Sequence, residues 1–82
     1  MEFFYTHTAE AHFKHLSKQT QKRIAAKMRF YAQQPDPLEF AEPLTGIAQY
    51  RFRIGDYRVR FEIIDRVAWV LSIRRRDEAY RK

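Results

Sequence analysis

YRFRIGDYRVRFEII, residues 50–64, combines the clearest structural pattern of this 82-residue chain with its most unusual arrangement of charge. Apolar and charged side chains alternate on both sides of Gly55 and Asp56, which is the period of a half-buried β-strand. Two such runs separated by a Gly-X pair predict a β-hairpin, in which Gly55 supplies the positive φ of a type II′ turn. The stretch therefore predicts two antiparallel strands joined by a two-residue turn.

A two-residue turn also fixes which side chains face one another across the hairpin. One predicted face is apolar and belongs to the core, with the pairs Ile54 and Tyr57, Phe52 and Val59, Tyr50 and Phe61. The other face opposes Arg53 to Arg58 and Arg51 to Arg60, with Glu62 as the only acid nearby. Like charges opposed across strands destabilise a sheet, so we interpret these arginines as an anion-binding site instead of an ordinary solvated face.

Composition places this hairpin in a small basic protein. The length predicts one domain, residues 1–82, and 45% hydrophobic residues with 16% aromatics are typical of a packed globule. The net charge of +6 comes from the second half, because residues 50–82 hold ten Lys or Arg against five acids. Nine of those ten are Arg, whose planar guanidinium matches phosphate and carboxylate groups. The expected partner is therefore a polyanion, either a nucleic acid or an acidic protein segment.

Several other classes of protein are disfavoured. There is no cysteine for a disulfide or a thiolate metal site, which fits a reducing compartment, and we expect a cytoplasmic protein. The N-terminus does not predict a signal peptide, and the longest apolar run, residues 67–71, is too short to span a membrane. We expect no cofactor, no metal, no membrane contact and no small-molecule ligand.

Two helices are predicted before the hairpin. Residues 2–5 form a short aromatic strand, after which Thr8 is the expected N-cap of a helix ending near Ser17. His12 and His15 could share one face of this helix, but a metal site needs three or four ligands, so we interpret both as solvated.

A longer amphipathic helix is predicted over residues 18–34, and Ile24, Met28 and Tyr31 form its core stripe. Helices this close in sequence predict an antiparallel αα-hairpin. Residues 38–49 read as a connection. Residues 67–73 are apolar on both faces, which predicts a strand inside the sheet.

Three landmarks in this order, LTG at residues 44–46, the hairpin motif and IRRRDEAY at residues 73–80, resemble the RelE/ParE family of bacterial type II toxins. The resemblance covers nearly the whole chain. It implies an α+β fold with an N-terminal strand, an αα-hairpin and a three-stranded antiparallel meander, the helices packed on one face of the sheet. It also implies a cognate antitoxin protein with an acidic contact segment. The RelE branch of the family cleaves mRNA on the ribosome, whereas the ParE branch inhibits DNA gyrase without nuclease chemistry.

The resemblance to RelE-like toxins also assigns site residues. Catalytic roles fall on Arg53, Arg58, Arg76 and Tyr80, and RNA binding on Arg51 and Arg75. From the basic face and the other cations of the chain, we also expect Arg60, Arg74 and Lys22 to bind RNA. Arginine stays protonated and moves protons poorly, so these residues hold a phosphate better than they transfer protons. Glu39 or Glu42 could serve as the base, but no histidine follows His15 to serve as the acid.

We therefore expect a ribosome-dependent mRNA endoribonuclease that works without a metal, with the ribosome and mRNA as partners besides the antitoxin. The alternatives are a ParE-like gyrase inhibitor and a basic binding module with weak or no catalysis.

Overall fold

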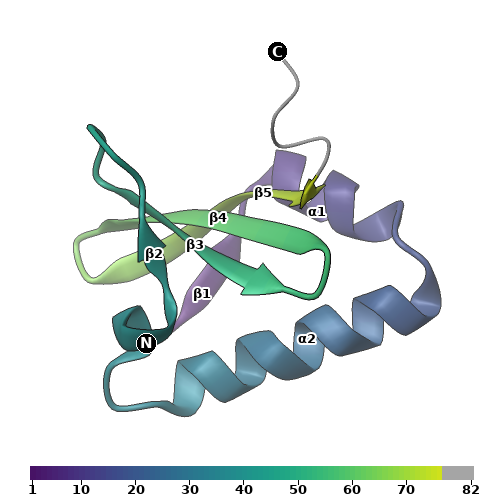
Figure 1. The fold of residues 1–82 in the computed structure, drawn as a ribbon, viewed down its shortest axis with the longest axis horizontal. Helices are drawn as coiled ribbons and strands as arrows, with labels where there is room; N and C mark the ends of the chain where they lie inside the picture. Colours follow the sequence, from purple (N-terminus) through teal and green to yellow (C-terminus); the bar gives the residue numbers. More distant parts are fainter. Residues whose placement is uncertain (77–82) are drawn as a thin grey trace.

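A computed structural model describes residues 1–76, which form a five-stranded sheet and two α-helices (Figure 1). Along the chain the elements are β1 (Phe3–Tyr5), α1 (His7–Lys14), α2 (Lys18–Gln33), the 3-10 helix η1 (Pro37–Phe40), β2 (Glu42–Pro43), β3 (Gln49–Ile54), β4 (Tyr57–Ile64) and β5 (Val67–Arg75). This order confirms the predicted α+β fold, in which a strand and two helices precede a three-stranded antiparallel meander.

The spatial order of the sheet is β1-β5-β4-β3-β2, and only β1 with β5 is a parallel pair. The strand β5 is paired on both sides, as its two apolar faces predicted, although β4 is the middle strand. The strand β2 lies within the stretch predicted as a connection. Two residues, one of them Pro43, are too few to show the period of a strand.

The predicted hairpin register is confirmed at every pair from Tyr50 and Phe61 to Ile54 and Tyr57. Gly55 has φ +59°, while Asp56 does not have a positive φ, which is the combination of a type II′ turn. The turn between β4 and β5 is different, because Asp65 and Arg66 have φ of 50° and 68°. Two positive φ values indicate a type I′ turn, which also matches the right-handed twist of the strands it joins.

The helix α1 begins earlier than predicted. Its N-cap is Thr6, whose Oγ1 accepts from the Ala9 N–H at 3.1 Å, so the prediction of Thr8 was wrong. Thr6 is also the first residue after β1, and its own N–H donates to the Val70 carbonyl at 3.1 Å. The strand edge therefore decides where the helix starts. The chain then reverses direction between α1 and α2, as expected of an αα-hairpin (Figure 1).

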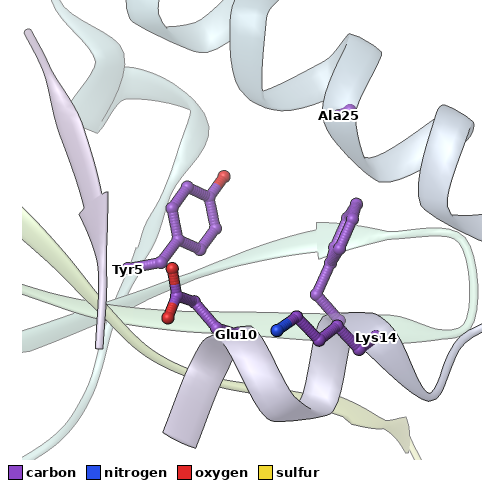
Figure 2. Close-up of a pocket in the computed structure, with 5 residues that line it drawn as sticks. Tyr5, Glu10, Lys14 and Ala25 are labelled. Atoms are coloured by element: carbon purple, nitrogen blue, oxygen red, sulfur yellow. The ribbon is translucent and has the colours of Figure 1, made fainter. Parts of the chain in front are cut away.

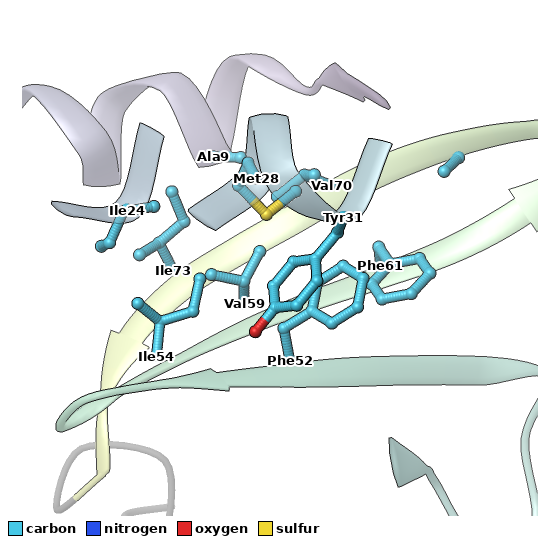
Figure 3. Close-up of a cluster of buried hydrophobic side chains, with 11 residues drawn as sticks. Ala9, Ile24, Met28, Tyr31, Phe52, Ile54, Val59, Phe61, Val70 and Ile73 are labelled. Carbon is cyan, nitrogen blue, oxygen red and sulfur yellow. The ribbon is translucent and has the colours of Figure 1, made fainter. Parts of the chain in front are cut away.

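The core lies between α2 and the inner face of the sheet (Figure 3). The ring of Tyr31 stacks on Phe52 at a centroid distance of 4.0 Å and an interplanar angle of 14°, and Phe52 stacks on Phe61 at 4.7 Å. The predicted stripe of α2 is confirmed, since Ile24, Met28 and Tyr31 are all buried. Neither α-helix within residues 1–76 is long and apolar enough to cross a membrane.

Candidate nucleic-acid interface

The face of the sheet opposite the core carries five arginines, which we call the arginine face: Arg51, Arg53, Arg58, Arg60 and Arg74. The hairpin register opposes Arg53 to Arg58 and Arg51 to Arg60, as predicted. The pairing of β4 with β5 adds Arg74 opposite Arg58. Arg53, Arg58 and Arg74 thus form one row across three adjacent strands, where directly paired residues lie about 5 Å apart.

A carboxylate from β2 lies beside these arginines. Glu42 Oε1 accepts from Arg51 Nε at 3.0 Å, and Glu42 Oε2 lies 3.8 Å from Arg53 Nη1. The prediction that Glu62 is the only acid nearby was therefore wrong, because it rested on a hairpin without β2. Of the two carboxylates considered as a base, the structure brings Glu42 to the arginines and leaves Glu39 exposed on η1. Glu42 reduces the repulsion between the opposed arginines and also competes with an incoming anion.

The five arginines differ in their access to solvent. Arg53, Arg60 and Arg74 are exposed and Arg51 is half-buried, whereas Arg58 in the middle of the row is only 6% exposed. An anion arriving from solvent therefore meets the exposed arginines before Arg58. Burial lowers the effective dielectric constant around a charge, so Arg58 interacts more strongly with a nearby charge than the exposed arginines do.

Two exposed aromatic rings lie on the same side of the sheet as the arginine face. Trp69 is the partner of Glu62 in the sheet, which places its side chain outward, and Phe4 is its partner on β1. Their rings are 5.4 Å apart, with 42% of Phe4 and 37% of Trp69 exposed. Nucleic-acid bases stack on such rings, so this face combines cations for phosphates with a platform for bases. The alternation of β5 showed two apolar faces without indicating that one of them would be open.

The other predicted site residues are divided between different places. Arg75 is the partner of Tyr57 and follows Arg74, so it faces the helix side of the sheet. Arg76 follows β5, and its N–H donates to the Asp56 carbonyl at 2.6 Å, which ties the end of the strand to the hairpin turn. Lys22 is exposed on α2, in the helix layer, and does not reach the arginine face. Tyr80 lies outside the described residues.

A different cation of α2 reaches the hairpin. The guanidinium carbon of Arg23 lies 2.8 Å from the position that a Cβ on Gly55 would occupy, so the guanidinium covers the turn directly. No sequence pattern indicated this contact, since Arg23 belongs to a run of helix cations typical of a solvated face.

His12 is not the solvated histidine that was predicted. It is half-buried, and its Nδ1 accepts a hydrogen bond from the Ile73 N–H at 3.1 Å. His15 is exposed, and both histidines line a cavity of about 280 Å³ together with Tyr57, Arg74 and Arg75. Within residues 1–76 no group of three or more His, Cys, Asp or Glu side chains is placed to hold a metal ion.

A second cavity of about 350 Å³ lies between β1, α1 and α2 (Figure 2). Tyr5, Glu10 and Lys14 surround it, and Ala25 of α2 closes one side. Burial raises the pKa of the Tyr5 hydroxyl. None of the predicted site residues lines this cavity, so it is separate from the arginine face.

The chain matches the sequence model of a known protein family over most of its length. The sequence model of a family described as the ParE toxin of type II toxin-antitoxin system, parDE, matches residues 3–80. No curated protein matches the chain significantly.

Several solved structures have the same fold. A chain of the RelBE2 toxin–antitoxin complex from Mycobacterium tuberculosis has a TM-score of 0.75 and 22% identity, covering 92% of this chain and 96% of that chain. A chain of the RelB–RelE complex from Methanococcus jannaschii has a TM-score of 0.77 and 19% identity, covering 94% of both chains. The isolated E. coli RelE toxin has a TM-score of 0.74 and 18% identity, covering 90% of this chain and 82% of that chain.

Proposed function

Because the chain belongs to the ParE toxin family of type II toxin–antitoxin systems, within the RelE/ParE superfamily, we propose that it inhibits translation as a ribosome-dependent mRNA endoribonuclease. The observation that carries this proposal is the arginine face with its neighbouring aromatic pair, Phe4 and Trp69. Exposed guanidinium groups bind phosphates, and the rings bind unstacked bases, which is the combination needed for single-stranded RNA. Two solved structures that contain the E. coli RelE toxin share the fold of this chain at 18% identity.

The proposed reaction is attack by a ribose 2′-OH on the adjacent phosphorus. The bond from the 2′-oxygen to phosphorus forms and the bond to the 5′-oxygen breaks, leaving a cyclic phosphate and a 5′-OH. The proton lost by the 2′-OH must be accepted, and the departing 5′-oxygen must receive one. Arg53, Arg60 and Arg74 hold the phosphate, and the buried Arg58 stabilises the charge that develops in the transition state. Glu42 is the carboxylate placed to accept the proton, although its ion pair with Arg51 has to open.

The proposed partners are the ribosome with its mRNA and a cognate antitoxin. The similar structures include complexes of RelE with RelB antitoxins. For this chain we expect an antitoxin whose acidic segment neutralises the arginine face, because among residues 1–76 five cations of this face lie near two acids, Glu42 and Glu62.

Mapping mRNA 5′ ends in a translating extract tests this function. The wild-type protein is expected to cut mRNA within codons, and Arg53→Gln or Arg60→Gln to reduce cutting at least about tenfold, since each removes a charged hydrogen-bond donor to phosphate. Arg29→Gln is the matched control, because Arg29 is exposed on α2. Trp69→Ala is expected to weaken RNA binding without changing the cut position. A folded wild-type protein that binds ribosomes and leaves mRNA intact would exclude the proposed reaction.

The description of the matching family favours one second candidate, a ParE-like inhibitor of DNA gyrase. This activity would use the arginine face as a protein-binding surface and involve no RNA cleavage. Supercoiling by purified gyrase discriminates the two, since only the second candidate predicts inhibition at low micromolar protein. Inhibited gyrase together with intact mRNA would replace our first proposal by this one.

A further inference from the structure

A second row of side chains crosses the open face of the sheet beside the arginines. Sheet pairing places the aromatic pair next to an acid on β4, and that acid next to an amide on β3. We call these four residues the Glu62 row: Phe4, Trp69, Glu62 and Gln49. Directly paired residues lie about 5 Å apart, so an acid and an amide stand beside the rings on which a base would stack.

Glu62 is an acid on a face that otherwise suits a polyanion. It is half-buried and lies two residues from Arg60 on β4, about 6.8 Å along the strand. Glu42 forms ion pairs with the arginine face at 3.0 Å and 3.8 Å, whereas Glu62 forms none with any residue in the range 1–76. Its carboxylate therefore repels a phosphate without neutralising an arginine by direct contact, and phosphate binding does not explain its position.

The amide of Gln49 has a hydrogen-bonding group that the folded chain does not use. Its Oε1 is buried and has no hydrogen-bond partner among residues 1–76. A buried acceptor without a hydrogen bond is unfavourable, so a rotation that lets this amide bond to a ligand lowers the free energy. A glutamine amide offers an N–H donor as well as an acceptor, which makes Gln49 able to read either kind of group on a base.

The edge of guanine matches these two polar side chains. A carboxylate accepts two parallel hydrogen bonds, and the Watson–Crick edge of guanine carries two adjacent donors, N1–H and N2–H. The third group on that edge is the acceptor O6, which an amide N–H can bind. Adenine, cytosine and uracil each present one donor group next to an acceptor on this edge, and a carboxylate repels that acceptor. The acid therefore favours guanine over the other three bases.

We propose that the Glu62 row is a guanine-reading site for single-stranded RNA. The base stacks on Trp69 and Phe4, Glu62 accepts from its N1–H and N2–H, and Gln49 donates to its O6. Arg60, in the next row along the strands, holds the phosphate of the same nucleotide. The RNA as the source of the base rests on the proposed function, whereas the preference for guanine rests on this row alone. The site decides which codons are cut and not where the cut falls within a codon.

The fluorescence of Trp69 reports binding directly, because it is the only tryptophan of the chain. The purified protein is titrated separately with the 5′-monophosphates of guanosine, adenosine, cytidine and uridine. Stacking on the ring is expected to quench the fluorescence. The guanosine nucleotide is expected to bind about tenfold more tightly than the other three, since a bidentate pair discriminates bases by about this factor. All four carry the same phosphate, so the ratio of affinities measures the contribution of the base.

Two variants separate base reading from stacking. Glu62→Gln keeps the size of the side chain and removes one of the paired acceptors, so the preference for guanine is expected to fall below about twofold. Glu39→Gln, exposed on η1, is the matched control and is expected to keep the preference. Phe4→Ala removes part of the stacking surface and is expected to weaken all four nucleotides alike, because stacking tolerates every base. Thermal unfolding of each variant shows that it is folded.

The outcomes distinguish this site from the proposed nuclease. Equal affinities of the wild type for the four nucleotides, unchanged fluorescence with all of them, or a preference that Glu62→Gln leaves intact would each refute the site. Guanine enriched at one fixed distance from the cuts in a translating extract, and lost in Glu62→Gln, supports it. Guanine-selective binding by a protein that leaves mRNA intact supports the site and contradicts only the nuclease, whereas cutting without any base preference contradicts only the site.

Discussion

Replacing Glu42 with Gln tests how strongly the arginine face repels itself. The change keeps the size of the side chain and removes the only carboxylate that, within residues 1–76, forms ion pairs with these arginines. Arg51 and Arg53 then face Arg60 and Arg58 without their ion pairs to Glu42. We expect the variant to be less stable than the wild type at low salt and to bind RNA more tightly.

The distances set the magnitude. In a medium as polar as water, Coulomb's law gives about 1.4 kcal/mol for charges 3.0 Å apart and about 1.1 kcal/mol at 3.8 Å. The side chains of Arg51, Glu42 and Arg53 are 30%, 44% and 53% exposed, so solvent screening and side-chain ordering reduce these values. Measured exposed pairs contribute about 0.2–1 kcal/mol each, and we expect a loss of about 1 kcal/mol for Glu42→Gln. For a domain of this size that is roughly 4–8 °C in Tm.

Urea unfolding followed by circular dichroism, at about 0.01 M and about 1 M NaCl, measures this loss. The screening length falls to about 3 Å at the higher salt, so the difference from wild type should shrink to less than about half. Glu39→Gln is the matched control, since Glu39 is exposed on η1 and forms no ion pair with a residue in the described part of the chain. Equal losses for the two variants at low salt would refute the view that Glu42 compensates the opposed arginines.

Three further changes test the fold. Gly55→Ala should cost about 1–2 kcal/mol in urea unfolding, because φ is +59° there, and should displace the Arg23 guanidinium. Gly46 has φ +82° and open space where a Cβ would stand, so Gly46→Ala introduces backbone strain without displacing a guanidinium. If the two variants had equal effects on RNA binding, a role for Arg23 in that binding would be excluded. Burial raises the pKa of Tyr31 above its value in the unfolded chain. The contribution of its neutral hydroxyl to the free energy of unfolding is therefore present below about pH 10 and is lost as the pH rises further. Tyr31→Phe should therefore flatten the alkaline loss of stability in pH-dependent urea unfolding, and an unchanged slope would contradict this. Phe52→Ala removes a fully buried ring and should cost about 3–5 kcal/mol by the same assay, whereas a loss below about 1 kcal/mol would refute its place in the core.

The hairpin could be predicted in detail because local signals determine it. Alternation assigns each side chain of residues 50–64 to a face, and Gly55 sets the turn type, which in turn sets the register. The opposition of Arg53 to Arg58 follows from these facts alone. The stripe of α2 is local in the same sense, since a period of 3.6 residues is visible within one helix.

The remaining features depend on contacts between distant residues. His12 and Ile73 are 61 residues apart, so nothing around either residue indicates their hydrogen bond. The position of Glu42 depends on the pairing of a two-residue strand, and two residues have no period to detect. Two threonines were available to cap α1, and Thr6 does so because the edge of β5 binds its N–H.

The parallel pairing of β1 with β5 has a consequence for synthesis of the protein on the ribosome. Phe3 of β1 pairs with Ala68 of β5, so 65 further residues must be synthesised before β1 can pair with its neighbouring strand. At about 5–20 residues per second this delay is roughly 3–13 s, during which the aromatic side chains of β1 lack their place in the sheet. Arg74 is added later still, so the row of three arginines is completed only after β5 has been synthesised. Until then a nascent chain presents only two of the three arginines of this row, Arg53 and Arg58.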